Sequence, residues 1–146
     1  MSIEKEDFEL ECDTERGCEA IDIIIKPREK DLGEFMVRRT LPTSQRKTVG
    51  PWIFFDHMGP ANFPAGSGVN VRPHPHINLA TVTYLFDGEI LHRDSIGSYA
   101  TITPGDINLM VAGKGITHSD RERPEVKNVP HTLHGLQLWL ALPEED

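Results

Sequence analysis

The stretch Leu79–Asp94, LATVTYLFDGEILHRD, contains two runs of β-branched, aromatic and aliphatic residues. Residues of these types favour strands, because they fit a pleated and half-buried surface. Asp87-Gly88 lies between the two runs, and Asp-Gly in this setting is a strong signal for a tight reversal. We therefore predict strands over Leu79–Phe86 and Glu89–Asp94 that are joined as a hairpin.

Runs of the same kind recur on both sides of this stretch, over Ala20–Lys26, Phe35–Leu41, Trp52–Phe55, Tyr99–Thr103, Ile107–Val111, Ile116–Ser119 and Leu133–Leu142. Loops rich in polar residues are expected over Asp56–Pro73 and Arg121–Pro130, and no long segment has a helical period. Roughly nine or ten short strands predict an all-β sandwich or barrel. A jelly roll fits best, because the mouth of a barrel can hold a metal and a small molecule.

The chain has 146 residues, which fits a single domain, and its net charge of −8 argues against nucleic acid or an anionic membrane as a partner. Eight acidic residues lie between Glu4 and Glu19. Residues 1–19 are therefore expected to form an acidic leader, and residues 20–146 the folded domain.

The cysteine pattern and the chain start both indicate the cytoplasm. Cys12 and Cys18 are not spaced as CxxC, so we expect reduced thiols. No secretory signal is visible, and no apolar run approaches the roughly 20 residues that span a bilayer.

His74-Pro75-His76 is the clearest functional signal. Residues two apart in a strand point to the same side, so His74 and His76 share a face, and His118 and Asp120 could share a face on another strand. Three imidazoles and one carboxylate would form a site for a divalent transition metal, with Fe, Mn, Ni, Cu and Zn all suitable. Pro75 stiffens the backbone between the first two ligands.

The other histidines have structural explanations. We expect His92 to make a structural hydrogen bond or to orient a metal ligand from outside, and His57 to anchor a loop. His131 and His134 are expected at the surface or in packing contacts. Glu122 is the second choice for an acidic ligand, with a solvated role favoured.

Four stretches closely resemble the amino-terminal domain of bacterial pirin-like proteins, which belong to the cupin superfamily: GPWIFFDHMGP (Gly50–Pro60), RPHPHINLATVTYLFDGEILHRDSIGS (Arg72–Ser98), TPGDINLMVAGKGITHSD (Thr103–Asp120) and HGLQLWLALP (His134–Pro143). The resemblance implies a cupin-type jelly-roll barrel with a metal, usually iron as Fe(II). It implies that His74, His76, His118 and Asp120 are the metal ligands. Some pirins cleave flavonols such as quercetin with dioxygen, and others are regulators that bind transcription factors.

Three departures from the family pattern matter. Asp120 stands where the family typically has Glu, and Ala80 stands where many cupins carry a further Glu. Pirins usually contain two cupin domains, and the sequence stops where the second would begin. Surface that the second domain covers would then be exposed, which favours a homodimer.

Two hypotheses about function follow. The first is an iron-dependent dioxygenase of the quercetin 2,3-dioxygenase type, with a flavonol and dioxygen as substrates and Asp120 as a ligand and as the base that accepts the hydroxyl proton. The alternative is a non-catalytic, metal-dependent regulatory module that binds a protein partner. A barrel with an empty or incidental metal site is the third possibility.

Overall fold

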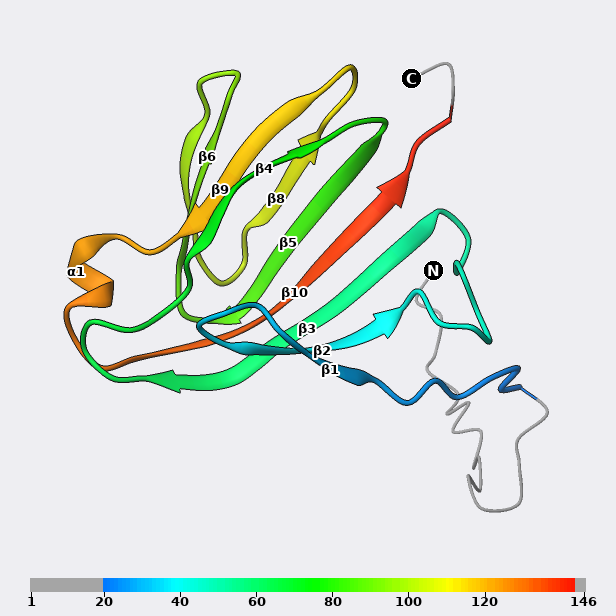
Figure 1. Cartoon of the computed structure of the whole chain (residues 1–146), viewed down its shortest axis with the longest axis horizontal. Coiled ribbons are helices and arrows are strands. Elements are labelled where there is room, and N and C mark those ends of the chain that lie inside the picture. The colour runs from blue at the N-terminus through cyan, green and yellow to red at the C-terminus, as the bar shows by residue number, and fades with distance from the viewer. Residues whose placement is uncertain (1–19, 144–146) are drawn as a thin grey trace, which may run out of the picture.

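Two antiparallel sheets face each other in the computed structural model, which describes residues 20–143 (Figure 1). The larger sheet has the order β1 (Arg28–Asp31), β2 (Met36–Leu41), β3 (Trp52–Phe63), β10 (His131–Ala141), β5 (Leu79–Asp87) and β8 (Ile107–Val111). The smaller sheet has the order β4 (Val71–His76), β9 (Ile116–Arg121), β6 (Ile90–Asp94) and β7 (Tyr99–Ile102). The predicted all-β jelly roll is confirmed. The expected leader, with Cys12 and Cys18, lies outside the described residues.

The core lies between the sheets, because alternate side chains of each strand point inward. The buried apolar side chains that form its main cluster are Phe35, Val37, Met58, Phe63, Val69, Leu85, Ile90, Ile102 and Leu133. This cluster also supplies much of the floor of a cavity between the sheets. The core therefore fixes the distance between the two sheets where the functional side chains face each other.

Two of the predicted segments differ from the structure. β3 continues to Phe63, so the expected loop over Asp56–Pro73 begins only after that residue. It extends because Asp56 and Met58 alternate inward while β2 and β10 pair with it on both sides. The predicted strand over Ala20–Lys26 is wrong, and the first strand within residues 20–143 is instead the polar segment β1, paired with β2.

The hairpin predicted at Asp87-Gly88 is also wrong. The chain does reverse there, and Gly88 has a positive φ of 89°. However, β5 belongs to the larger sheet and β6 to the smaller one, so the turn connects two layers. A Cβ on Gly88 would lie 2.4 Å from the backbone oxygen of Thr132, which shows how closely this crossing approaches β10.

The other connections contain little regular structure. Arg121–Pro130, expected as a loop, includes a single helical turn, α1 (Pro124–Lys127). Among residues 20–143, no helix has the length and hydropathy needed to cross a bilayer.

The leucines of β10 occupy the outer side of the larger sheet. Leu136, Leu138 and Leu140 alternate with Gln137 and Trp139, which line the cavity. These leucines therefore share one face of β10, which is half-exposed and turned away from the core. The pattern of alternation alone did not indicate which set of side chains faces inward.

Leu133 provides a direct test of this core. Its side chain is fully buried, so Leu133→Ala should lower the free energy of unfolding by about 2–5 kcal/mol through lost burial and a residual cavity. Urea denaturation followed by tryptophan fluorescence would measure the change. Ile96→Ala, at an exposed turn, serves as the control and should change it by no more than about 0.5 kcal/mol. Equal effects of the two substitutions would contradict the assigned core.

Candidate metal centre

The smaller sheet brings the candidate ligands together through the pairing of β4, β9 and β6. His74 on β4 lies directly opposite His118 on β9, whose partner on the other side is Asp94 of β6. One inward position further along β9, Asp120 lies opposite His92 of β6. Inward-facing side chains of adjacent strands are close neighbours. This register places the three histidines of β4 and β9, together with Asp120, on one wall of the cavity, and it places His92 and Asp94 of β6 beside them.

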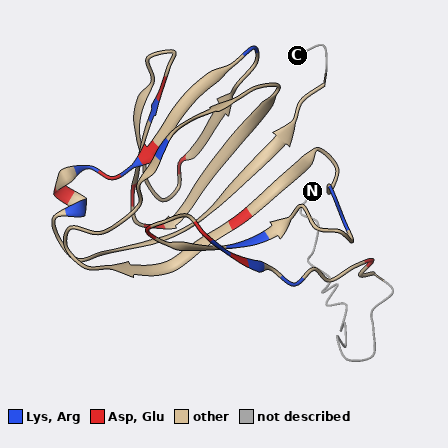
Figure 2. Ribbon diagram, in the orientation of Figure 1, with Lys and Arg blue, Asp and Glu red and all other residues tan. Residues whose placement is uncertain are grey.

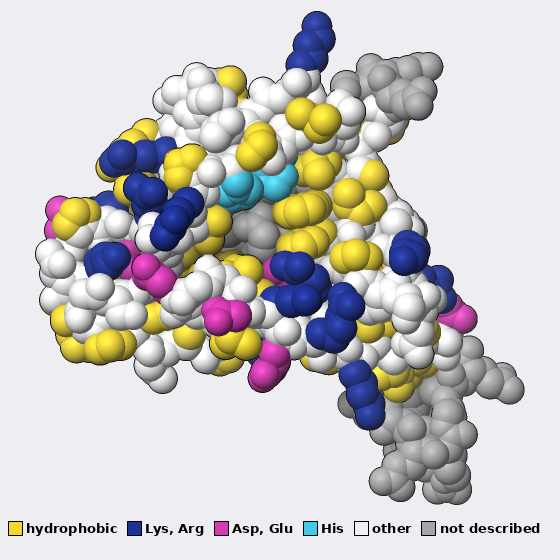
Figure 3. Space-filling view, in the orientation of Figure 1, with side chains coloured by type: hydrophobic (Ala, Val, Ile, Leu, Met, Phe, Trp, Pro, Cys, Tyr) yellow, Lys and Arg dark blue, Asp and Glu magenta, His cyan; other side chains and the backbone are white. Residues whose placement is uncertain are grey.

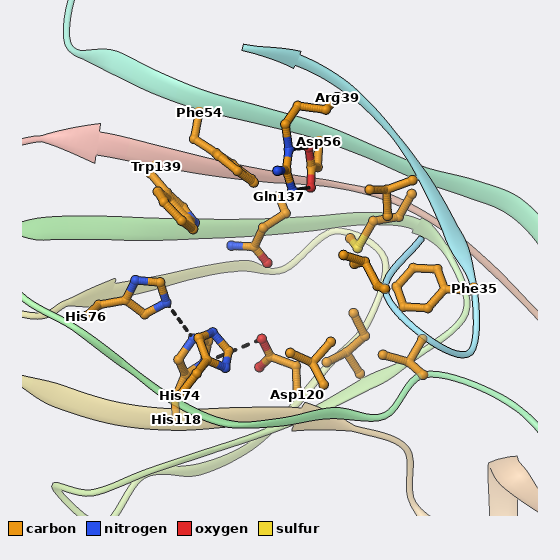
Figure 4. A pocket seen from close by; sticks show the side chains of 16 residues that line it. Phe35, Arg39, Phe54, Asp56, His74, His76, His118, Asp120, Gln137 and Trp139 are labelled. Atoms are coloured by element: carbon orange, nitrogen blue, oxygen red, sulfur yellow. Dashed lines mark hydrogen bonds and ion pairs between the residues drawn. The ribbon is translucent and has the colours of Figure 1, made fainter. Parts of the chain in front are cut away.

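Three of the predicted ligands form a compact group. One ring nitrogen from each of His74, His76 and His118 lies within 4.8 Å of the others. The Nε2 atoms of His76 and His118 are 3.1 Å apart. Two nitrogens that each lie about 2.0–2.1 Å from one metal ion would be separated by a similar distance. Figure 4 shows these rings together at one side of the cavity.

The other ring nitrogens of this group show how two of the rings are oriented. Nδ1 of His74 lies 2.8 Å from the backbone oxygen of Arg72 and can donate its proton there. Nδ1 of His118 is buried without a hydrogen-bond partner and has Oδ2 of Asp120 as its neighbour at 3.4 Å. Metal-binding histidines commonly direct their second N–H at a carbonyl or carboxylate. Both rings therefore leave Nε2 available to the centre.

Asp120 belongs to a different group from the one expected. Its carboxylate lies with His92 and His118 in a second cluster whose ligand atoms are within 4.8 Å of one another, and it is not part of the three-histidine cluster. Oδ1 of Asp120 is 3.1 Å from Nδ1 of His92. The structure thus brings all four predicted residues to one wall of the cavity. However, the carboxylate of Asp120 points to His92 and not into the group of three histidines.

The protonation states suit metal binding. Burial, followed by repulsion from His118 and His74, lowers the pKa of His76 to about 4, so this imidazole is neutral at neutral pH. Burial raises the pKa of Asp120, but the contacts with His118 and His92 outweigh it and lower this pKa to about 2. The hydrogen bond to Asp120 raises the pKa of His92, and the hydrogen bond to Asp94 adds to this effect. Burial lowers this pKa, but the two hydrogen bonds outweigh it. Metal ligands must be deprotonated, and His76 and Asp120 meet that condition.

A cavity of about 160 Å³ opens beside the histidines. Figure 3 shows histidine side chains at a hollow in this face of the molecule, with hydrophobic side chains beside them. Its apolar lining matches the usual character of small-molecule sites. Its volume lies below the roughly 300–1,000 Å³ of pockets that enclose drug-sized ligands, so a ligand of that size would extend through the open side.

The opposite wall carries residues that the sequence did not mark as functional. Arg39 donates two hydrogen bonds to Asp56, both of 2.8 Å, and its guanidinium lies 4.4 Å from the centre of the Phe54 ring. Phe54 stacks on Trp139 at 4.0 Å, and Trp139 meets the edge of His76. Trp139 thus forms part of the cavity wall (Figure 4). The alternation along β10 already separated Trp139 from the leucines. Only the pairing of β10 with β3 in the larger sheet showed that the side of Trp139 faces the cavity.

The remaining histidines lie away from this wall. His57 is in β3 rather than a loop, and its Nε2 is 2.8 Å from Nε2 of His134. His131 lies 3.0 Å from Oε2 of Glu122. The solvated role favoured for Glu122 is wrong, because its side chain is only 1% exposed. His92 makes the expected structural hydrogen bonds, to Asp94 and Asp120.

Comparison with known proteins identifies the family of this chain. The family model described as Pirin matches residues 34–140. A pirin-like protein of Caulobacter vibrioides is 52% identical over 127 residues, which are 86% of this chain and 44% of that protein. A crystal structure of quercetin 2,3-dioxygenase from Acinetobacter baumannii aligns with a TM-score of 0.76 and 41% identity, over 82% of this chain and 39% of that one.

A more distant likeness concerns the fold alone. An RmlC-like cupin family protein of Methanocaldococcus jannaschii, described as a double-stranded β-helix, aligns with a TM-score of 0.51 and 12% identity over 83% of this chain and 92% of that one. The fold is therefore of the cupin type, a double-stranded β-helix. Within that class, the chain belongs to the pirin family. It spans less than half the length of the Caulobacter relative.

The low pKa of His76 predicts how acid affects the metal-free protein. Between pH 6.5 and about 4, the unfolded chain protonates this imidazole and the folded chain does not. The unfolded state then binds more protons, so His76 makes the free energy of unfolding fall as the pH is lowered through this window. Urea denaturation with a chelator present would measure this, and His76→Leu should lose this part of the pH dependence. Parallel curves for the two proteins from pH 6.5 to 4 would contradict the assignment.

Proposed function

We propose that this chain binds a divalent metal through His74, His76 and His118 and is the metal-binding cupin domain of a flavonol-cleaving dioxygenase. The observation that carries the proposal is the 3.1 Å separation of the Nε2 atoms of His76 and His118 at the edge of an apolar cavity. The likeness to the Acinetobacter quercetin 2,3-dioxygenase supports the substrate class. A nitrogen-rich donor set suits Fe(II), our first choice, and also Zn, Mn, Ni or Cu.

The metal, when bound, would supply the redox chemistry that lets dioxygen react with an organic substrate. The chain's own residues would position that substrate and exclude water. The stacked rings of Phe54 and Trp139 offer a flat apolar wall opposite the histidines, which suits an aromatic ligand. The Arg39–Asp56 pair lies on the same wall and satisfies its own charges, so it adds polarity without a net charge.

Asp120, expected as ligand and base, suits another role better. General bases work best when their pKa lies near the working pH. A carboxyl group whose pKa is lowered to about 2 stays ionised and accepts a proton weakly. We therefore assign Asp120 the role of a fixed negative charge beside His118. The 3-hydroxyl proton of a flavonol would instead pass to water at the open side of the cavity. Residence in the cytoplasm remains part of the proposal.

Loss of the flavonol absorbance band tests the activity. Iron-loaded protein incubated with quercetin under oxygen should bleach the band, and the rate with His118→Ala or His74→Ala should fall by at least about 100-fold, because each substitution removes a proposed ligand. His131→Leu, which alters a histidine outside the cavity, is the matched control and should retain the rate. Bleaching that continues without oxygen, or that is equal in all variants, would contradict the proposal.

A second candidate function, self-association, is favoured by the outer face of the larger sheet. Its exposed apolar side chains include Ile107, Leu109 and Val111 of β8, exposed by 70%, 57% and 51%. These residues pair in register with Tyr84, Val82 and Ala80 of β5, whose partners on β10 are the outward leucines. Figure 2 shows β5, β8 and β10 almost free of charged residues.

We propose a second copy of this chain as the occupant of the outer face. An apolar area that runs across three adjacent strands is unusual for a surface that faces only water. A twofold axis would place the same face on both partners.

Leu109→Lys would place a charge at the middle of this face. We expect the wild-type protein to be a dimer at micromolar concentration and the variant to be a monomer, measured by light scattering after size-exclusion chromatography. Ile96→Lys, at an exposed turn outside the outer face, should remain a dimer. A monomeric wild-type protein, or an equal shift in both variants, would overturn this partner.

A further inference from the structure

His92 lies buried between two carboxylates and does not line the cavity. Its Nδ1 is 3.1 Å from Oδ1 of Asp120, and its Nε2 is 3.1 Å from Oδ2 of Asp94. The His92 and Asp94 side chains are each 3% exposed. Both ring nitrogens are thus engaged, and the ring cannot turn without breaking contacts on both sides. His92 therefore holds a fixed donor against Asp120.

The far side of His92 is itself anchored. Oδ1 of Asp94 accepts hydrogen bonds from the backbone N–H of Ile96, at 3.2 Å, and of Ser98, at 2.9 Å. This carboxylate is therefore built into the turn between β6 and β7. A continuous chain of contacts leads from that turn through Asp94, His92 and Asp120 to Nδ1 of His118.

The register explains why Asp120 turns to His92. His118 has His74 as its cross-strand partner on β4, whereas Asp120 has Val71 on β4 and His92 on β6. The titratable residue directly opposite Asp120 is thus His92. A short Asp side chain keeps its carboxylate close to its own strand, while a Glu would carry it one methylene further toward the three histidines.

We propose that His92 is a positioning residue that holds Asp120 outside the ligand set of the centre. Asp120 then orients His118 through Nδ1, and the protein supplies three histidine ligands and no carboxylate. The inference rests on the proposed binding of metal by His74, His76 and His118. It matches the general arrangement in which a carboxylate outside the ligand set fixes the ring of a metal-binding histidine.

Two consequences separate this arrangement from one in which Asp120 binds the metal. Replacing Asp120 by Asn should leave the ligand set unchanged and weaken metal binding by about 10–100-fold, as for other partners of ligating histidines. Replacing His92 by Leu should free Asp120 to reach the metal, so the ligand set should change. That change should require the carboxylate, and it should vanish in the double variant.

Cobalt(II) titrated into the metal-free protein is the probe, because its visible absorption bands respond to the number and type of ligands. We expect wild-type protein and Asp120→Asn to share one spectrum, and His92→Leu to differ from both. The double variant His92→Leu/Asp120→Asn should return to the wild-type spectrum. His92→Asn keeps an N–H near the position of Nδ1, and it should also retain that spectrum.

His131→Leu is the matched control, because His131 is also a largely buried histidine that contacts a buried carboxylate, Glu122 at 3.0 Å. It lies outside the cavity lining, so its cobalt spectrum should match that of the wild type. If the spectrum of His131→Leu also changed, the effect of His92→Leu would reflect a general loss of packing, and the inference would be overturned.

Other outcomes are equally decisive. A spectrum altered by Asp120→Asn alone would make Asp120 a ligand and overturn the inference, while the metal centre itself would stand. This readout holds even where His92→Leu does not fold. A wild-type protein that binds no cobalt would instead refute the proposed metal centre, and the role of His92 with it.

Discussion

Antiparallel pairing of β4, β9 and β6 is the constraint on which the site depends. It fixes His74, His118 and Asp94 in one cross-strand row and Asp120 and His92 in the next. A shift of one residue in any of these strands would turn the site residues of that strand to the other face of the sheet. The apolar core beneath the cavity stabilises this register, because β6 contributes Ile90 to it and Val71 of β4 packs against it. Packing and ligand geometry are therefore set by the same strand alignment.

The two sheets line opposite sides of the cavity with side chains of different chemistry. The smaller sheet supplies His74, His76, His118 and Asp120, and the larger sheet supplies Phe54, Trp139 and the Arg39–Asp56 pair. Burial lowers the pKa of His76 and keeps it neutral, and the contacts of Asp120 with His118 and His92 keep that carboxylate ionised. A site of this kind can bind a metal on one side and an aromatic group on the other, which is the basis of the proposed function.

Most of the strands could be predicted from the sequence, but the strands that each of them pairs with could not. Leu79–Phe86 has a local signature, because β-branched and aromatic residues prefer extended backbone. Asp87-Gly88 indicated a reversal but not that the chain crosses between sheets. β3 was expected to end at Phe55, because the stretch from Asp56 onward has polar residues, Gly and Pro that usually indicate a loop. Pairing on both sides, by β2 and β10, overrides that local preference.

By itself, the sequence determined the strand-rich fold, the family likeness and the three histidines as one group, because the spacing of two residues and the quoted motifs are local properties. The tertiary structure decided which face of β10 meets the cavity, that Glu122 is buried, and that Asp120 lies against His92 rather than with all three histidines. These depend on contacts between strands far apart in the chain. The His-Pro-His segment supplied two ligands, and β9 and β6 decided what surrounds them.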